Sequence, residues 1–274
     1  MRDNPYLKNR SIFLPLLMRG SNQGSAISTT TALPKALFEP SLNSYSVKGI
    51  SFEMIQPPRL DNKLISLPNV EMCSTECTQE LFEAVMGFNP SGFKGKADSP
   101  KRPIEQVSWF DCIAFCNKLS QELGLTPYYS LTSIEYTPDK SIKRAAVEVL
   151  GGNGFRLPTE AEWELFAKAG TNNKWSGTNI EAELKYYAWD NTNSKDETHP
   201  IATKKPNEWG MYDMSGNVWE WCWDTYTSTS AFRVYRGGSW FNNASRLRSA
   251  IRDHHLPSNR FAYIGFRVSR SPHG

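Results

Sequence analysis

The chain has 274 residues, of which 39% are hydrophobic and 22% are charged. This length and balance are typical of a globular protein with a full core, and they exclude an intrinsically disordered chain and a small disulfide-dependent scaffold. No apolar run is long enough to span a membrane, since residues 12–18 form a short stretch that contains Pro15. The net charge of +3 is mild, but residues 231–274 hold eight Arg and a single acid, Asp253.

The first part of the chain shows little periodicity. Residues 1–45 are rich in Ser, Thr, Asn and Pro, which predicts an extended arm or linker. A single compact domain is predicted over residues 46–270. Its first strand is expected at residues 50–54, where apolar and polar side chains alternate as they do when one face of a strand meets a core.

Three helices are predicted from their capping residues. Each follows a Ser or Thr whose hydroxyl can accept a hydrogen bond from the first turn, and each stops at a Gly. The third also carries a capping box, in which a Glu three residues after the cap bonds back to it. The predicted helices are residues 79–86 after Thr78, a helix from Ser108 to Gly124, and a helix from Thr159 to Gly170. Beyond Gly170 we expect short strands and loops supported by aromatic side chains.

The five cysteines are predicted to be buried small side chains. Two pairs are spaced four residues apart, but no His or further Cys lies at zinc-ligand spacing. Cys112 and Cys116 share one face of the second predicted helix with Leu119 and Leu123, which explains them as packing residues.

The C-terminal tract has an unusual composition. Residues 233–240 read Arg-Val-Tyr-Arg-Gly-Gly-Ser-Trp, and residues 264–267 read Ile-Gly-Phe-Arg. Between them, residues 241–263 follow neither a period of 2 nor one of 3.6, so packing does not select these side chains. They also contain no Lys, Glu, Gln, Met or Trp, five types that together make up about one residue in five of the chain.

Five ordered motifs resemble those of the formylglycine-generating enzyme, or sulfatase-modifying factor, family. The resemblance covers roughly residues 46–270, and five motifs in order are far more specific than any one of them. It implies an α+β fold, the formylglycine-generating variant of the C-type lectin fold, with few helices, short antiparallel strands and long loops. The motifs are Glu83-Ala-Val-Met-Gly-Phe-Asn-Pro-Ser91, Pro103-Ile-Glu-Gln-Val-Ser-Trp109, Arg156-Leu-Pro-Thr-Glu-Ala-Glu-Trp163, Gly210-Met-Tyr-Asp-Met-Ser-Gly-Asn-Val-Trp-Glu-Trp221 and Arg236-Gly-Gly-Ser-Trp240.

The family's oxidase chemistry is not expected here. In the oxidising enzymes that this sequence resembles, two cysteine thiolates after the Gly-Gly-Ser motif hold copper. The resemblance places Asn242 and Leu247 at those positions, and neither side chain can act as a thiolate. No cysteine follows Cys222. We therefore expect a non-enzymatic protein. The alternative is a formylglycine-generating oxidase that acts on a sulfatase cysteine.

The resemblance also suggests a structural calcium ion near the Gly-Asn-Val-Trp-Glu-Trp motif. Asn217 and Glu220 would supply side-chain oxygens, with backbone carbonyls near Val218 and Cys222. The alternative, left open by the sequence, is that Asn217 stabilises a turn and Glu220 makes a structural hydrogen bond. No other cofactor is predicted.

One branch of the family suggests an origin for the missing residue types. In the variable proteins of diversity-generating retroelements, template adenines are copied with errors, so that AAC codons become NNC. Such codons never encode Lys, Glu, Gln, Met or Trp. Within a variable region of about residues 223–267, the positions predicted to be diversified and to bind ligand are Tyr235, Phe241, Asn242, Ser245, Arg246, Ile251, Asp253, His254, His255, Ser258, Asn259, Phe261, Ala262 and Tyr263.

This resemblance predicts a non-enzymatic, receptor-like or adhesin-like protein. Aromatic and Arg side chains favour a protein ligand, with a glycan as the alternative. Nucleic acid is not expected, because no Lys-rich cluster accompanies the Arg residues. The resemblance also implies a lipoprotein at the cell surface or outside the cell, although no anchor or export signal is visible. Two ambiguities remain: His254 and His255 could form a metal pair, and Phe241 and Tyr263 could pack in the core.

Overall fold

The computed structural model describes residues 39–58 and 69–272, so most of the predicted arm lies outside the described residues. Strand β1 (Ser41–Val47) pairs antiparallel with β2 (Ile50–Gln56) around a two-residue turn. Strand β2 confirms the predicted first strand, but β1 begins before the expected boundary at residue 46. Strand β1 could not be predicted from the sequence, because most of its side chains are exposed and apolar residues therefore do not alternate along it.

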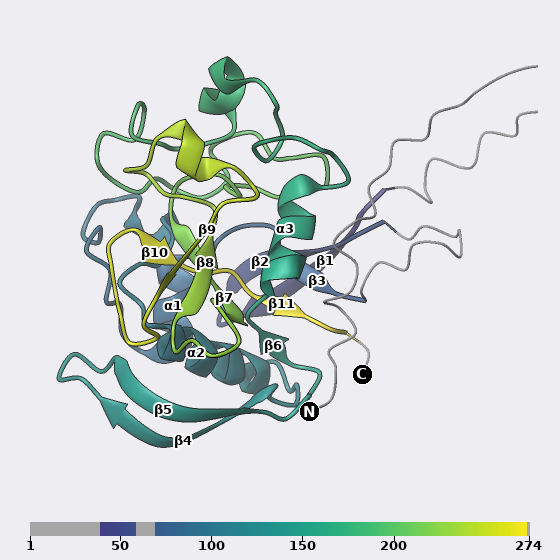
Figure 1. Cartoon of the computed structure of the whole chain (residues 1–274). Helices are drawn as coiled ribbons and strands as arrows, with labels where there is room; N and C mark the ends of the chain where they lie inside the picture. Colours follow the sequence, from purple (N-terminus) through teal and green to yellow (C-terminus); the bar gives the residue numbers. More distant parts are fainter. Residues whose placement is uncertain (1–38, 59–68, 273–274) are drawn as a thin grey trace, which may run out of the picture. The chain divides into compact units, whose positions relative to one another are not determined.

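The first sheet joins both ends of the described chain. Its order is β1-β2-β3-β11-β6, and its neighbouring strands are antiparallel. The C-terminal strand β11 therefore lies between β3 and β6, as Figure 1 shows. The bounds of the remaining strands of this sheet are Glu71–Cys73 for β3, Phe155–Arg156 for β6 and Ser269–Arg270 for β11.

The three predicted helices are confirmed with their N-caps, whereas the third ends at the left-handed residue Ala169, one residue before the predicted Gly170. Thr78, Ser108 and Thr159 each accept a hydrogen bond from the first turn, and the last two form full capping boxes. The helices are α1 (Gln79–Met86), α2 (Trp109–Glu122) and α3 (Glu160–Lys168). Among the described residues after α3, the only helices are short 3-10 turns, and none of the described helices is long and apolar enough to cross a bilayer. The 3-10 turns of the described chain are η3 (Ser99–Lys101), η4 (Glu181–Tyr186) and η5 (Ala244–Leu247).

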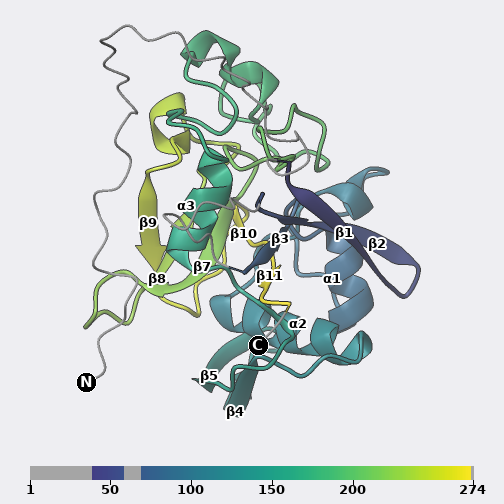
Figure 2. The same ribbon diagram turned by 90° about the vertical axis from the view of Figure 1, so that its right-hand side faces the viewer.

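The second sheet carries the C-terminal tract. Its order is β10-β7-β8-β9, in which β10 runs parallel to β7 and the other pairs are antiparallel. Helix α3 packs against β7 and β8, and Figure 2 shows the three side by side. The bounds are Trp219–Thr225 for β7, Arg233–Arg236 for β8, Arg252–His255 for β9 and Ile264–Gly265 for β10.

A separate hairpin, β4 (Tyr129–Tyr136) with β5 (Ile142–Val149), lies along α2 in both views. The core between these layers is rich in aromatic side chains, and Trp109, Trp163 and Trp221 are fully buried in it. All five cysteines are buried and free, and Cys112 and Cys116 lie on the buried face of α2, as predicted. The described residues, 39–58 and 69–272, all belong to one compact unit.

Candidate functional site

The unusual C-terminal tract forms the rim of the second sheet. It leaves β8, turns through η5, returns as the edge strand β9 and re-enters the sheet as β10. Glycines bound the tract at both ends: Gly238 has a φ of +76°, and an added Cβ at Gly265 would lie 2.3 Å from the Ile104 carbonyl oxygen. The close approaches explain why glycine occupies the boundaries of the tract.

Residues of the tract are held mainly through their backbone. Carbonyl groups accept hydrogen bonds from donors that lie outside the tract or in the tryptophan framework, so attachment at these points does not depend on which side chain the tract residue carries. The bonds run from Trp219 N–H to the Tyr263 carbonyl (2.8 Å), from Gln106 N–H to Phe261 (3.0 Å), from Trp109 N–H to Pro257 (2.9 Å), from Asn191 N–H to Asn242 (3.1 Å) and from the Trp240 indole N–H to Ala262 (3.0 Å).

The predicted ligand-binding positions differ in their exposure. All except Tyr235 are at least partly exposed. The exposed ones are Phe241, Ser245 and Ser258; the half-buried ones are Asn242, Arg246, Ile251, Asp253, His254, His255, Asn259, Phe261, Ala262 and Tyr263.

Tyr235 is a correction to this set. It lies on β8, is only 4% exposed, and packs edge-on against Trp219 and Trp221 with ring centroids 5.0 and 5.5 Å away. Burial raises the pKa of its hydroxyl. The tryptophans that bury Tyr235 come from β7, so its own sequence surroundings gave no sign of this contact. A ligand can reach at most its edge.

Exposed rings of the tract form a continuous row. Phe241 contacts Tyr263 with ring centroids 4.7 Å apart, and Tyr263 stacks on Phe261 at 4.9 Å. Phe261 contacts His255 at 4.6 Å, and His255 stacks over Tyr235 at 5.4 Å. Phe241 is 41% exposed, whereas Phe261 and Tyr263 also pack partly against the core. The row is therefore a half-open aromatic surface.

The two histidines serve opposite faces of β9. His254 stacks on Tyr226 with ring centroids 3.9 Å apart and contacts Phe232, whereas His255 lies in the aromatic row on the other face. This follows from the two-residue side-chain period of a strand. The imidazoles therefore do not form a metal pair. Burial lowers the pKa of His255, which favours its neutral form.

A charged pair lies beside the aromatic row. The guanidinium of Arg246 forms an ion pair with Asp253 and lies over the Trp219 ring, 5.5 Å from its centroid. Side chains of this pair are 43% and 31% exposed, so solvent or a ligand can compete for both.

The other Arg residues of the tail hold the scaffold. Arg236 is buried, bonds to the Ile251 carbonyl and pairs with Glu164 of α3. Arg252 pairs with Glu160 at the start of the same helix. Hydrogen bonds or ion pairs to protein groups are made by Arg233, Arg236, Arg246, Arg252, Arg260, Arg267 and Arg270.

The oxygens proposed for calcium have protein partners instead. Glu220 is fully buried, and Arg267 donates to both of its carboxylate oxygens at 2.6 and 2.7 Å. The Trp163 indole N–H adds a third bond to Glu220, at 2.7 Å. The Asn217 carboxamide oxygen accepts the His199 N–H at 3.0 Å. These side chains do not fit a calcium site, and their arrangement favours the structural alternative.

Asn242 and Leu247 occupy two different environments. The Asn242 carboxamide oxygen accepts hydrogen bonds from the Trp219 indole and from Ser239. Leu247 is fully buried in a small apolar cluster with Trp175 and Leu184. All five thiols lie elsewhere, and burial raises the pKa of each, which keeps it protonated.

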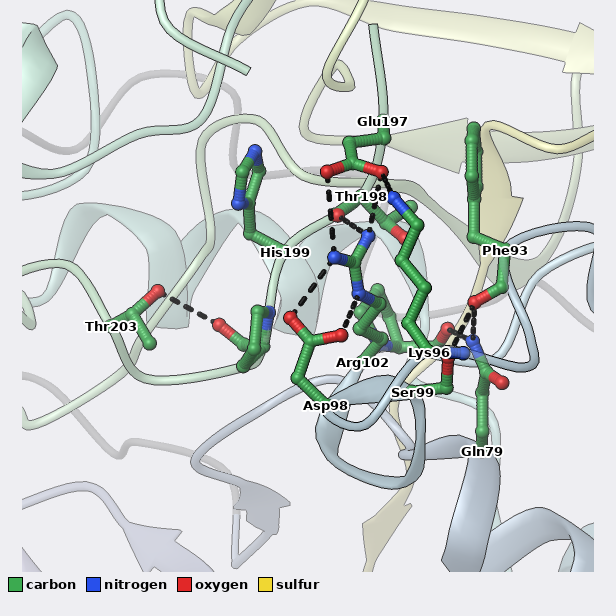
Figure 3. A network of polar contacts seen from close by, with 12 residues as sticks. Gln79, Phe93, Lys96, Asp98, Ser99, Arg102, Glu197, Thr198, His199 and Thr203 are labelled. Carbon is green, nitrogen blue, oxygen red and sulfur yellow. Dashed lines mark hydrogen bonds and ion pairs between the residues drawn. The ribbon is translucent and has the colours of Figure 1, made fainter. Parts of the chain in front are cut away.

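One aromatic neighbour of this surface was not predicted from the sequence. Phe93 contacts Trp240 edge-on with ring centroids 5.5 Å apart, from a loop far away in the chain. Figure 3 shows the polar network that holds this loop: Ser99 donates to the Phe93 carbonyl at 3.1 Å, and Arg102 bonds to both oxygens of Asp98. A single phenylalanine in a polar loop carries no sequence signal for such a contact.

Comparisons with known proteins identify the family to which this chain is similar. The family model described as "Sulfatase-modifying factor enzyme 1-like domain" matches residues 40–272. The chain is 35% identical to the "Chaperone protein LppX" of Paenibacillus barcinonensis, over 73% of this chain and 79% of that protein. It is 26% identical to the formylglycine-generating enzyme of Thermomonospora curvata, over 64% of this chain and 57% of the enzyme, so it spans little more than half of that relative.

Two solved structures are similar in both sequence and fold. Treponema denticola variable protein 1 is 38% identical with a TM-score of 0.72, covering 85% of this chain and 100% of that one. The structure of CarF is 30% identical with a TM-score of 0.58, covering 73% of this chain and 85% of that one. The predicted α+β fold of the formylglycine-generating type and the resemblance to variable proteins are confirmed.

Proposed function

The chain belongs to the family of sulfatase-modifying factor enzyme 1-like domains, and from this premise we propose that it is a non-enzymatic variable protein whose C-terminal tract binds ligands. The observation that carries the proposal is that the backbone and the side chains of the tract have separate roles. Its backbone carbonyls hold it to the scaffold, while most of its predicted variable side chains are exposed or half-buried. Side chains can then be exchanged at these positions without removing the bonds that fix the loops.

The chemistry of the tract supports binding rather than oxidation. Copper-dependent oxidation in this family needs two thiolates, because a soft metal needs soft ligands. At the corresponding positions this chain has the carboxamide of Asn242 and the buried aliphatic side chain of Leu247. Similarity to Treponema denticola variable protein 1 over 85% of the chain adds to this support.

A protein is the favoured ligand. The surface offers a row of aromatic rings beside the Arg246–Asp253 pair, and aromatic and Arg side chains dominate the energetics of protein interfaces. A glycan ligand is the alternative that the same rings could stack on. Nucleic acid is disfavoured, because the Arg residues of the tail are committed to protein partners and Arg248, the exception, lies over the Trp175 ring.

We place this binding surface outside the cell, on the cell surface. A lipid anchor would hold the protein there. The test is cell fractionation together with protease treatment of intact cells: degradation of the protein by the added protease supports this location, and recovery of intact protein from the cytoplasmic fraction contradicts it.

A display library tests the binding function. The positions Phe241, Ser245, His254, Ser258 and Asn259 are randomised with NNC codons and selected against a panel of purified, unrelated proteins. Specific binders that keep the wild-type unfolding temperature are the expected result. A matched library at Glu181, Glu183 and Lys185 of η4 is the control, and equal enrichment from both libraries contradicts the assignment of the surface.

The oxidase alternative has its own assay. The full chain is incubated with a Cys-containing sulfatase peptide, copper and oxygen, and the product is analysed for aldehyde by mass spectrometry. We expect none. Enzymatic turnover to aldehyde would overturn the non-enzymatic assignment, whatever the outcome of the display library.

A further inference from the structure

A groove lies outside the predicted variable positions. This groove of about 410 Å³ opens between α2, the segment that follows α1 and the hairpin β4–β5. This volume falls in the range of pockets that bind small molecules, about 300–1,000 Å³. Figure 1 shows the hairpin β4–β5 running beside α2.

The walls of the groove are apolar. Met86 and Phe88 come from the end of α1 and the following loop, and Leu131, Ile134 and Ile142 come from the hairpin. Ile134 remains 36% exposed, so an apolar ligand would remove further hydrocarbon surface from water.

Two polar side chains of the groove are already hydrogen-bonded to the protein, whereas its two lysine amines have no ion pair. The Asn117 side chain donates to the Tyr129 carbonyl at 2.7 Å and accepts the Tyr129 N–H at 3.2 Å, and the Thr137 hydroxyl bonds to the Ser141 carbonyl at 3.0 Å. Lys118 and Lys140 also line the groove, and neither amine has an ion-pair partner within the described residues.

Two other cations that contact α2 or the hairpin have carboxylate partners. Lys48 pairs with Glu122 of α2, and Arg260 pairs with Asp139 in the turn of the hairpin. The groove therefore combines hydrocarbon walls with two positive charges that no protein carboxylate neutralises.

The hairpin wall is fixed in place. The backbone N–H of Ile142 donates to Asp111 at 2.7 Å, and its carbonyl accepts the Ser108 hydroxyl at 2.9 Å, so the cap of α2 holds both groups. Arg260 adds a bond to the Ser141 hydroxyl at 2.7 Å. A ligand would therefore meet a groove that is already formed, which lowers the entropic cost of binding.

We propose that this groove binds a small amphipathic carboxylate of the medium-chain fatty acid type. The hydrocarbon chain lies along Phe88, Leu131 and Ile134, and the carboxylate lies between the amines of Lys118 and Lys140. This proposed binding site is separate from the predicted variable positions, because none of them lines the groove.

The test is calorimetric titration of the full chain with decanoate and with its uncharged methyl ester. We expect saturable binding of decanoate, weakened about tenfold by the double substitution Lys118→Gln and Lys140→Gln, since two partly exposed ion pairs are lost. The ester is expected to bind about tenfold more weakly than the acid for the same reason. Lys143→Gln, on the same hairpin but outside the groove, should leave binding unchanged.

A second pair of variants tests the apolar wall. Ile134→Asp should abolish decanoate binding, whereas Val149→Asp, at the other end of the hairpin and 49% exposed, should not. Circular dichroism checks that each variant is folded. Absence of saturable decanoate binding to the wild type, or equal binding by the wild type and the double Lys variant, overturns the proposal. Should Ile134→Asp unfold, the double Lys variant still decides.

Discussion

The carboxamide oxygen of Asn242 accepts the indole N–H of Trp219 at 2.8 Å. The same oxygen accepts the Ser239 N–H at 3.1 Å and the Ser239 hydroxyl at 2.9 Å. Trp219 is 2% exposed, so this contact joins a half-buried tract position to the core. Within the predicted variable set, the contacts of Asn242 thus make it a structural residue, in contrast to Ser245 and Ser258, whose side chains are exposed.

Asn242→Ala is expected to destabilise the fold. The substitution leaves the buried indole N–H of Trp219 without an acceptor, which costs about 1–3 kcal/mol of unfolding free energy. Urea denaturation measures the loss. Ser258→Ala, on an exposed loop, is the matched control and should stay within about 0.5 kcal/mol of wild type. Equal stability of the two variants would show that water replaces the carboxamide as the acceptor.

Helix caps made much of the fold predictable from sequence. Thr78, Ser108 and Thr159 act over three residues, so a local pattern is enough to place α1, α2 and α3. The surface could be predicted only in outline. Burial of Tyr235 by β7 and the contact of Phe93 with Trp240 depend on residues distant in sequence, which no local pattern records.

Gly238→Ala is expected to destabilise the fold more than the same substitution at another glycine with a similar φ. Gly238 has φ +76°, and an added Cβ would lie 2.7 Å from Leu247 Cδ1, within the buried cluster that holds η5. Gly95 has φ +88° but no atom within 4 Å of the added Cβ, so Gly95→Ala reports the backbone strain alone, about 1–2 kcal/mol.

The difference between these two glycine variants measures the steric clash. We expect Gly238→Ala to cost about 1–3 kcal/mol beyond Gly95→Ala in thermal or urea unfolding. A difference near zero would mean that Leu247 moves aside at no cost, and the tight link between the Gly-Gly turn and η5 would be wrong.

Glu105 is expected to make stability fall as pH rises towards neutral. Its carboxylate is fully buried; one oxygen accepts the Phe93 N–H at 2.9 Å, and the other has no hydrogen-bond partner among the residues that the structure describes. Burial raises the pKa of Glu105 from an ordinary 4.5 to about 7. Between these two values the folded state binds more protons than the unfolded state, so unfolding becomes easier with rising pH, by on the order of 3 kcal/mol in all.

Glu105→Gln removes this dependence. Denaturant unfolding of wild type and variant between about pH 5 and pH 8 should therefore converge at the acidic end, and the variant should be the more stable at the basic end. Glu181→Gln, in the exposed η4 turn, controls for the loss of one charge and should run parallel to wild type. If the curve of Glu105→Gln runs parallel to that of wild type, the Glu105 carboxyl has its ordinary pKa in the folded protein.

Substitutions in the tract are expected to cost stability in proportion to contact with the core. The triple variant Ser245→Tyr, Ser258→Tyr, Asn259→Tyr keeps every backbone bond described above and should change unfolding free energy by less than about 0.5 kcal/mol per site. Ile251, Phe261 and Tyr263 pack partly against the main core, so replacing all three by Ser should cost about 1–3 kcal/mol per site.

All six introduced residues can be encoded by NNC codons, so both variants contain only residue types that the expected diversification can produce. Unfolding temperatures and ligand selectivity are measured together on both triple variants. If the Tyr variant unfolds as readily as the Ser variant, the exposed loops are part of the folding core and cannot carry exchangeable side chains. If only the Ser variant is destabilised, diversification at Ile251, Phe261 and Tyr263 must favour large apolar residues, because these positions serve the core as well as the surface.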